Sequence, residues 1–419
     1  MRLPAYNPSM NASSPDRRRN TPGSPFDALV IGRGAIGAAT ALGLARAGLK
    51  VGVVAPRATP PASPQSWDAR VFALSPATRA LLERLHVWNA LDAARIAPVY
   101  DMRIHPSARE GSPQLHFSAY EACVDALAWI VEGSNLAGAL ERALSFAGVT
   151  QVDDSVVSVD ASDPAQATVA LAGGRSLQTR LVVGADGGNS PLRAMLGLPV
   201  LERAYPQTAV VANFETGLPH RDCAWQWFGP QGVLALLPLP GQRCSLVWSA
   251  PHALAAELRA LAPQALADRV AEAAWQVLGG MRCITPPQSF PLRLIQVDRS
   301  IAPRAVLVGD AAHVVHPLSG QGMNLGFGDV RALIDVVGGR EAFRDPGDPL
   351  LLRRYQRART EAVATMRLTT DGLQRLFDDE ATLPLPGLLR PLVGARELGW
   401  RLVERSAWLK RRLIAHAAA

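Results

Sequence analysis

The chain has 419 residues, of which 48% are hydrophobic and 19% are charged, and its formal net charge is +7. This composition excludes a disordered or fibrous protein, and the length predicts a large core shared by two closely joined domains. Binding of nucleic acid would need the positive charge on one face together with a reader motif, and the sequence shows no such motif. No apolar run reaches the ~20 residues of a membrane-spanning helix.

Neither the amino terminus nor the cysteines indicate export from the cell. Residues 1–25 are rich in Ser, Pro and Asn and lack an apolar stretch, so they predict a disordered tail and not a signal peptide. The four cysteines lie far apart, without CxxC or His partner spacing: Cys123, Cys223, Cys244 and Cys283. We expect buried, reduced thiols and a cytoplasmic protein.

The first predicted unit is a buried strand at 26–31, a glycine-rich turn and an Ala- and Leu-rich helix ending near Ala47. Glycines in such a turn permit a tight bend, close approach of the backbone to a pyrophosphate and close helix packing. A purely structural turn is the alternative, because glycine-rich turns end many strands. We predict dinucleotide binding, and the candidate residues are Gly32, Gly34, Ala35, Ile36 and Gly37.

The second predicted strand departs from the usual dinucleotide pattern. Such folds commonly end this strand in Glu or Asp, which holds the adenosine ribose, whereas Ala55 occupies that position here. The loss of one charge-assisted hydrogen bond is worth about 1.5–3 kcal/mol, or ten- to a hundredfold in affinity. We therefore expect weaker cofactor binding or another acceptor for the ribose, such as a backbone carbonyl.

A second glycine-bearing turn follows an apolar strand at 181–184. Here Asp186 lies between Gly184 and Gly187, and Ser190 is placed to cap the helix that follows. Alone, this pattern is also compatible with an ordinary turn. Arg193 is expected to tie the turn down, which is a structural role.

Two β-rich insertions are predicted at 98–120 and 201–300, with alternating strands broken by Pro and Gly turns. Helical periodicity covers His252–Val277, on a face suited to cover a sheet. The aromatic residues at Trp225, Trp227 and Phe228 could line an apolar substrate pocket or could belong to the core.

The most informative segment is 306–330, where an apolar strand ends in Gly-Asp and a loop with Pro and Gly opens a new helix. Asp310 can accept hydrogen bonds from the hydroxyl groups of a polyol, and the unpaired amides of a helix N-terminus bind negative charge. The candidate catalytic residues in this loop are His316, Pro317, Gly320 and Gln321, and the binding residues that follow are Gly322, Met323 and Asn324.

His313 and His316 lie three residues apart, but no carboxylate or Cys partner is evident, so no metal site is expected. A hydrogen bond within the loop is the preferred role for each. Proton donation or acceptance by His316 is the functional alternative.

The sequence of residues 346–419 predicts helices that lie outside the core. Within 385–419, seven basic residues stand against two acidic ones, and leucines recur at spacings of four and seven near Trp400 and Trp408. A basic amphipathic helix with tryptophans can lie on a bilayer. Docking on its own domain and an oligomer or partner contact are the other interpretations.

In order and spacing, the three turns resemble those of the single-component FAD-dependent aromatic hydroxylases, such as para-hydroxybenzoate hydroxylase. The resemblance narrows to the ubiquinone-biosynthesis hydroxylases and runs from about Phe26 to the C-terminus. The segments that carry it are 68–75, 232–239, 247–249 and 316–326. It implies an α/β fold in which a Rossmann-like FAD-binding domain is interleaved with a β-rich substrate domain, followed by C-terminal helices.

The resemblance implies a discontinuous FAD-binding domain at 26–100, 121–200 and 301–345, and a substrate domain at 98–120 and 201–300. In it, the first glycines hold the FAD pyrophosphate, Asp186 shapes the cleft and Asp310 binds the ribityl chain. Arg70 contacts a phosphate or the flavin edge, with a surface salt bridge as the alternative. The amides from about Gly320 to Asn324 are suited to stabilise reduced flavin.

The implied reaction is hydroxylation of the aromatic ring of a polyprenylated phenol in ubiquinone biosynthesis, with O2 as co-substrate and a flavin C4a-hydroperoxide. Electrons would come from NAD(P)H or a partner, since the sequence has no second glycine fingerprint. The implied location is the cytoplasmic face of the inner membrane, with a biosynthetic complex as a further partner. A hydroxylase of a small soluble aromatic and a non-catalytic scaffold subunit are the alternatives.

Overall fold

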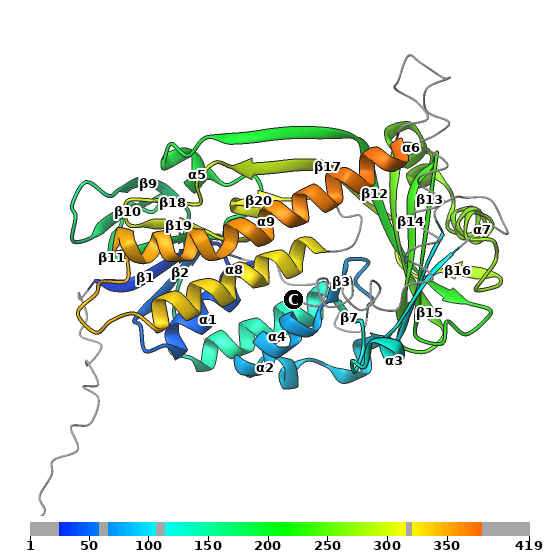
Figure 1. The fold of residues 1–419 in the computed structure, drawn as a ribbon, viewed down its shortest axis with the longest axis horizontal. Helices are drawn as coiled ribbons and strands as arrows, with labels where there is room; N and C mark the ends of the chain where they lie inside the picture. The colour runs from blue at the N-terminus through cyan, green and yellow to red at the C-terminus, as the bar shows by residue number, and fades with distance from the viewer. Residues whose placement is uncertain (1–24, 58–65, 106–113, 316–320, 379–419) are drawn as a thin grey trace, which may run out of the picture.

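The computed structural model describes residues 25–57, 66–105, 114–315 and 321–378, and all structural statements below refer to these residues. They form a mainly parallel sheet, a second, mainly antiparallel sheet and a small sheet between them. Figure 1 shows the long strands β12 (Val200–Thr216) and β17 (Gln288–Val297) running from the parallel sheet into the second sheet.

The parallel sheet is built from strands that are apolar on both faces, as a sheet covered on two sides requires. In spatial order its strands are β18 (Ile301–Ala302), β19 (Ala305–Leu307), β11 (Ser176–Gly184), β1 (Phe26–Ile31), β2 (Val51–Ala55) and β8 (Thr150–Asp153). Strand β18 pairs antiparallel to β19, and the other neighbours are parallel. The first residues of β11 also pair antiparallel with β10 (Ala167–Leu171), which in turn pairs antiparallel with β9 (Val156–Asp160).

Helices cover one face of this sheet and enclose the main core (Figure 1). They are α1 (Ala35–Arg46), α4 (Gly133–Phe146), α8 (Gln321–Gly338) and α9 (Pro349–Asp378), with α2 (Pro76–Arg84) beside α8. Helices α1 and α8 approach closely because Gly43 has no side chain: a Cβ there would lie 2.0 Å from Cδ1 of Ile334. The opposite face packs against β9, β10 and α5 (Pro191–Met195).

The second sheet carries its own core under two helices, α6 (His252–Ala260) and α7 (Pro263–Ala273). Its strands, in spatial order, are β20 (His313–Val314), β17, β12, β15 (Arg243–Pro251), β14 (Gly232–Leu239), β13 (Cys223–Gly229), β5 (Asp101–His105) and β6 (Leu115–Ser118), with β16 (Met281–Cys283) on β12. The helical periodicity predicted over His252–Val277 is thus confirmed, but it is divided between two helices. Pro263 begins a new helix, where a proline is tolerated because no N–H is needed.

The small sheet, β3 (Val71–Leu74), β7 (Ala128–Glu132) and β4 (Ile96–Val99), lies between the two larger sheets. Short helical turns complete the chain: α3 (Ala119–Ala122) and three 3-10 turns at Trp88–Ala90, Ala93–Arg95 and Gly309–Ala311. Residues Ala97, Val99 and Ile130 of the small sheet pack against Ala224 and Leu239 of the second sheet.

Helix α9 corrects the expectation that the chain leaves the core after residue 345. Leu351, Leu352 and Tyr355 are at most 1% exposed and belong to the main core. The Tyr355 hydroxyl donates a hydrogen bond to the Leu307 carbonyl at the end of β19, 3.1 Å away. The apolar face of the first turns is thus buried on the parallel sheet, where the hydrophobic effect holds it.

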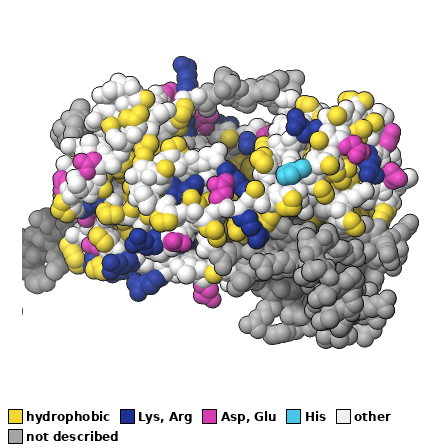
Figure 2. All heavy atoms as spheres, turned by 90° about the horizontal axis from the view of Figure 1, so that it is seen from above, with side chains coloured by type: hydrophobic (Ala, Val, Ile, Leu, Met, Phe, Trp, Pro, Cys, Tyr) yellow, Lys and Arg dark blue, Asp and Glu magenta, His cyan; other side chains and the backbone are white. Residues whose placement is uncertain are grey.

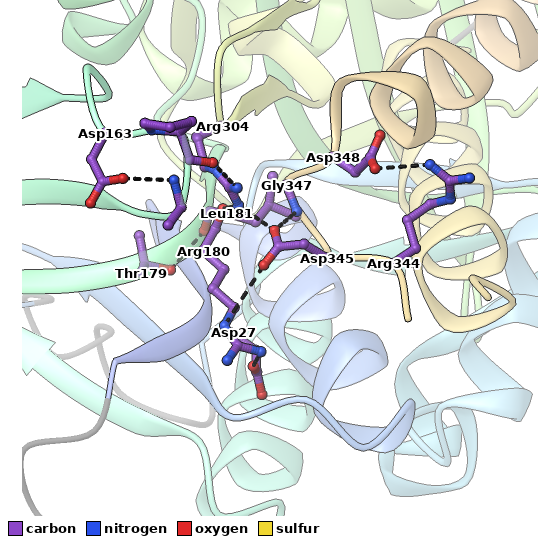
Figure 3. Close-up of polar contacts among 12 residues, drawn as sticks. Asp27, Asp163, Thr179, Arg180, Leu181, Arg304, Arg344, Asp345, Gly347 and Asp348 are labelled. Atoms are coloured by element: carbon purple, nitrogen blue, oxygen red, sulfur yellow. Dashed lines mark hydrogen bonds and ion pairs between the residues drawn. The ribbon is translucent and has the colours of Figure 1, made fainter. Parts of the chain in front are cut away.

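A polar cluster fixes the connection into α9 (Figure 3). Asp345 pairs with Arg304, which precedes β19, and lies 3.8 Å from Arg180 of β11. Arg180 also pairs with Asp27, at the start of β1, over 3.2 Å. These residues precede or begin strands β1 and β19, so the cluster lies toward the amino ends of the strands.

Several predicted features lie outside the described residues, namely the tail at 1–24 and the basic segment at 385–419. No described helix is both long and apolar enough to cross a membrane. All four cysteines are free. Cys223 and Cys244 are buried as expected, whereas Cys283 is only partly buried and Cys123, at the end of the one-turn helix α3, is exposed. On the face shown in Figure 2, cationic and anionic side chains are interspersed.

Candidate functional site

The three predicted turns meet at one edge of the parallel sheet. Strands β1, β11 and β19 are parallel neighbours in register, so the turns that follow them lie side by side. Two hydrogen bonds join them: Ala185 N–H to the Ile31 carbonyl, at 2.8 Å, and Val308 N–H to the Gly184 carbonyl, at 2.9 Å. The carboxyl edge of a parallel sheet is where α/β folds bind their ligands.

The glycines of the first turn have different functions. Gly32 has a φ of +105°, and a Cβ on it would lie 2.3 Å from the Ala185 carbonyl oxygen; a Cβ on Gly37 would lie 2.1 Å from that of Gly32. Both are required by packing. Gly34 has nothing within 4 Å of its Cβ position, so its side of the turn is open.

The start of α1 suits an anionic group. No side chain caps this helix and its first turn holds no acidic residue, so the amides of Ala35 and Ile36 face no competing carboxylate. The Ile36 side chain has another task, because it packs between Gly309 and Gly326. A Cβ on these glycines would lie 3.0 and 2.9 Å from it, respectively.

The Asp186 turn leaves one carboxylate oxygen without a donor. Its Oδ2 accepts the N–H of Leu192 at 3.0 Å, whereas Oδ1 is buried without a hydrogen-bond partner. A buried acceptor in this state costs free energy unless a ligand or water supplies a donor. Arg193 donates to the carbonyls of Gly188 and Ala311, each at 3.0 Å, and so ties this turn to the Asp310 turn, which is the predicted structural role.

Asp310 follows Gly309, whose φ of +60° lets the chain turn sharply after β19. Its side chain reaches solvent. Surrounding protein atoms nonetheless desolvate the carboxylate and raise its pKa, and the positive charges of His313 and Arg293 oppose that rise only in part. An accessible carboxylate beside the other two turns can accept hydroxyls of a bound polyol.

A buried ionic group stabilises the turn at Gly309 and Asp310. Asp329 of α8 is 1% exposed; its Oδ2 accepts the Gly309 N–H at 2.8 Å and lies 2.7 Å from Nε2 of His313. Its Oδ1 accepts Nε of Arg359 from α9 at 2.6 Å. Burial alone would raise the Asp329 pKa, but His313, Arg359 and the Gly309 amide together lower it.

The sequence interpretation missed this carboxylate partner of His313. A signal was available, since Asp329 is the only charged residue among the buried positions described for α8. A charge on an apolar helix face indicates a buried partner. The partner Arg359 lies on another helix, 30 residues further on, and no local pattern connects the two.

Asn324 fixes the start of α8 through its side chain. Its Oδ1 accepts the N–H of Ser75 at 2.9 Å and the hydroxyl of Thr78 at 2.8 Å, and its Nδ2 donates to the Ala73 carbonyl at 2.8 Å. The amide group is thereby used within the protein, so only the backbone of Asn324 is left for the predicted cofactor contact. Met323 packs against the main core, and the Gly322 Cβ position touches only Val315.

The remaining candidates are less constrained. Arg70 is exposed just before β3, and its side chain forms no ion pair among the described residues, so the salt-bridge alternative is not found there. Gln321 is the first residue of α8 and is partly buried. His316, Pro317 and Gly320 lie outside the described residues, and their roles stay predictions.

Comparison with known proteins agrees with this geometry. Residues 25–369 match the family described as an FAD binding domain. The chain is 34% identical to the ubiquinone hydroxylase UbiL of Rhodospirillum rubrum, over 93% of this chain and 89% of that protein. It is also 34% identical to the 3-demethoxyubiquinol 3-hydroxylase of Escherichia coli, over 94% of this chain and 98% of that protein. The chain belongs to the FAD-dependent hydroxylases of ubiquinone biosynthesis.

Solved structures confirm the predicted fold class. PqsL of Pseudomonas aeruginosa is 25% identical and superposes with a TM-score of 0.72, over 85% of this chain and 97% of PqsL. The p-nitrophenol 4-monooxygenase of Pseudomonas putida gives the same TM-score at 16% identity, over 94% of this chain and 98% of that one, which shows the fold alone. With the family, the predicted enzyme class is confirmed: an FAD-dependent aromatic-ring monooxygenase.

Proposed function

We propose that this hydroxylase acts on the ring of a polyprenylated phenol in ubiquinone biosynthesis, with O2 as co-substrate. The observation that carries the proposal is the meeting of the Gly32, Asp186 and Asp310 turns at one sheet edge. The names of the two bacterial relatives, a ubiquinone hydroxylase and a 3-demethoxyubiquinol 3-hydroxylase, support the substrate class.

The residues present fit FAD. The uncapped start of α1 and the open side of Gly34 suit a pyrophosphate, and the accessible Asp310 carboxylate suits the ribityl hydroxyls. The orphaned Oδ1 of Asp186 is an acceptor that the protein itself leaves unused. Together these groups would hold one extended ligand along the carboxyl edge.

Bound FAD supplies what side chains lack, the activation of O2 for attack on an electron-rich ring. The protein supplies position and electrostatics. The start of α8, from Gln321 to Asn324, would place backbone amides toward negative charge, and Asn324 holds that helix end against β3 and α2. Asp329 and Arg193 would keep the Asp310 carboxylate in place.

The second sheet packs one face under α6 and α7 and turns the other toward the small sheet. Residues Ala212, Leu236 and Leu246 pack under α6 and α7, so alternate residues face the other way. That other face carries Val211, Val247 and Ala235, which are cross-strand neighbours on β12, β15 and β14.

The same face abuts the first part of the chain. Asn213 donates from Nδ2 to the Asp68 carbonyl at 2.8 Å, and Leu239 packs against the small sheet. Val211, Ala235 and Val247 offer apolar contact, whereas Asn213 and Ser245 of the same face are polar. The substrate class is therefore carried by the names of the relatives and not by this face.

Electron supply and location are part of the proposal. Electrons from NAD(P)H or from a partner protein both fit a chain with one glycine-rich dinucleotide turn. The basic segment 385–419 would hold the enzyme at the cytoplasmic face of the inner membrane, or within a biosynthetic complex. Co-sedimentation of the full chain with anionic and neutral lipid vesicles tests the membrane contact: equal recovery with both would contradict it.

The first test is the visible spectrum of the purified protein, before and after titration with FAD. Flavin bands or saturable binding are expected, and absence of binding at tens of micromolar FAD would favour the scaffold alternative.

The second test is the quinone profile of a bacterial strain that lacks its own ring hydroxylase and carries this gene. We expect the wild type and the surface control Glu257→Gln to consume the prenylated precursor, and Asp310→Ala to let it accumulate. Turnover of small soluble phenols without change in the prenylated pool would contradict the substrate assignment.

A further inference from the structure

Ala55 ends β2 at the position where dinucleotide folds place the acid that holds the adenosine ribose. Its methyl group cannot accept a hydrogen bond, and the residue is only 8% exposed. The backbone carbonyl considered as a substitute already accepts the N–H of Asp154 at 3.1 Å. That carbonyl keeps one lone pair, but a neutral acceptor contributes less than a carboxylate, so binding of FAD at ordinary strength favours a charged acceptor nearby.

The neighbouring strand, β8, carries a carboxylate, Asp153. Strand β8 pairs with β2 in parallel register, with Asp153 opposite Ala55. Adjacent strands lie about 4.8 Å apart, so the Asp153 backbone is one strand spacing from the position of the missing acid. The Asp153 side chain is 50% exposed, so the carboxylate is accessible to a ligand.

Arg33 orients this carboxylate toward the cofactor turn. Arg33 lies between Gly32 and Gly34, and its guanidinium reaches past the end of β2 to β8. There it donates to Oε1 of Gln151 at 2.8 Å and pairs with Oδ1 of Asp153 at 3.2 Å. The second oxygen of Asp153 has no hydrogen-bond donor among the described residues.

A solvated surface ion pair would be the ordinary explanation of this contact, and such pairs contribute little to stability. Three features set this pair apart. The arginine belongs to the glycine turn itself, and its side chain is only 16% exposed. The ion pair also crosses the end of β2, the strand that lacks the acid. A site for an extra nucleotide phosphate is disfavoured, because Asp153 neutralises the Arg33 charge.

We propose that Asp153, oriented by Arg33 and Gln151, accepts hydrogen bonds from the ribose hydroxyls in the adenosine half of FAD, in place of an acid at residue 55. The proposal rests on FAD binding at the site described above. It moves the ribose contact from β2 to β8 and makes Arg33 a positioning residue. It concerns binding of the cofactor and leaves the chemical step unchanged.

The test is the dissociation constant of the full-length protein for FAD and for FAD whose adenosine ribose lacks the 2′-hydroxyl. In the wild type, loss of the hydroxyl should weaken binding about tenfold or more, as expected for a charge-assisted hydrogen bond. In Asp153→Ala the two ligands should bind within about twofold of each other. This comparison does not depend on how the freed Arg33 charge affects the pyrophosphate.

Two further variants and a measurement of thermal unfolding separate loss of the ribose contact from misfolding. Ala55→Glu restores the usual acid, and it should strengthen FAD binding more in the Asp153→Ala background than in the wild type. Asp160→Asn, an exposed change on β9 of the same sheet, should leave both constants unchanged. Thermal unfolding of each protein identifies a variant that has lost its fold.

The proposal is overturned if Asp153→Ala keeps the full sensitivity to the 2′-hydroxyl, or if Ala55→Glu has the same effect in both backgrounds. Failure of the wild type to bind FAD at all is a different result, and it would contradict the proposed function as well. Binding of FAD by the wild type without any sensitivity to the hydroxyl overturns the ribose contact and leaves the proposed function intact.

Discussion

Asp329 accepts a hydrogen bond from the backbone N–H of Gly309 at 2.8 Å, and this contact joins α8 to the turn that carries Asp310. The same carboxylate is held by His313 and by Arg359 of α9. A buried carboxylate therefore connects three segments beneath the cofactor-binding turn. Its charge is stable there because two cationic or donor side chains and one amide surround it.

Replacement of Asp329 by Asn should lower the free energy of unfolding by about 3–5 kcal/mol, because the buried Arg359 loses its counter-ion. The Gly309 turn should loosen as well and weaken FAD binding. Urea unfolding, with and without FAD, measures both effects. The control is Asp335→Asn on the same helix, whose half-exposed pair with Arg84 is worth less than about 1 kcal/mol. Equal losses for both variants would contradict the buried role.

The same network predicts how stability changes with pH. The Asp329 pKa is lowered in the folded protein, since its partners outweigh burial, so the carboxylate stabilises the fold at any pH above the ordinary value of 3.8. This stabilisation should disappear as the pH falls below 3.8 and through the folded pKa. The free energy of unfolding should change less with pH across that range for Asp329→Asn than for the wild type. The same pH dependence in both proteins would show that other carboxylates determine acid unfolding.

Asp310 should behave in the opposite way. Burial raises its pKa, so the folded chain prefers the protonated form and the ionised group destabilises the fold above the ordinary value of 3.8. Asp310→Asn should therefore raise the free energy of unfolding of the FAD-free protein at pH 7. It should also weaken FAD binding about tenfold, through the loss of a charged acceptor. A variant that lost stability without losing affinity would contradict the assignment of Asp310 to the cofactor.

Two glycines of the first turn should separate folding from binding. Gly37→Ala places a Cβ 2.1 Å from the Gly32 carbonyl oxygen, so the turn must shift and the melting temperature should fall by several degrees. Gly34→Ala meets nothing within 4 Å and should fold normally, yet its methyl group would occupy the side open to the pyrophosphate. We expect a melting temperature near that of wild type but weaker FAD binding. Normal binding by Gly34→Ala would place the pyrophosphate elsewhere.

The strand–turn–helix units were predictable because their signals are local. An apolar strand followed by Gly32, Gly34 and Gly37, or by Gly309 and Asp310, specifies a sharp turn within a few residues. The structural role of Arg193 was also predicted, although one of its two partners, Ala311, is distant in the chain. Helix boundaries were less accurate, as the break before Pro263 shows.

The sequence by itself thus determined which turns this protein has and what chemistry each can offer. Only the tertiary structure decided which groups meet: Asp329 with Gly309 and Arg359, Arg33 with Asp153, and the first turns of α9 with the core. These contacts depend on the order of parallel strands and on helix packing between segments far apart in the chain. The periodicity of one segment carries no information on the register of another, so such pairs appear only when the whole sheet is assembled.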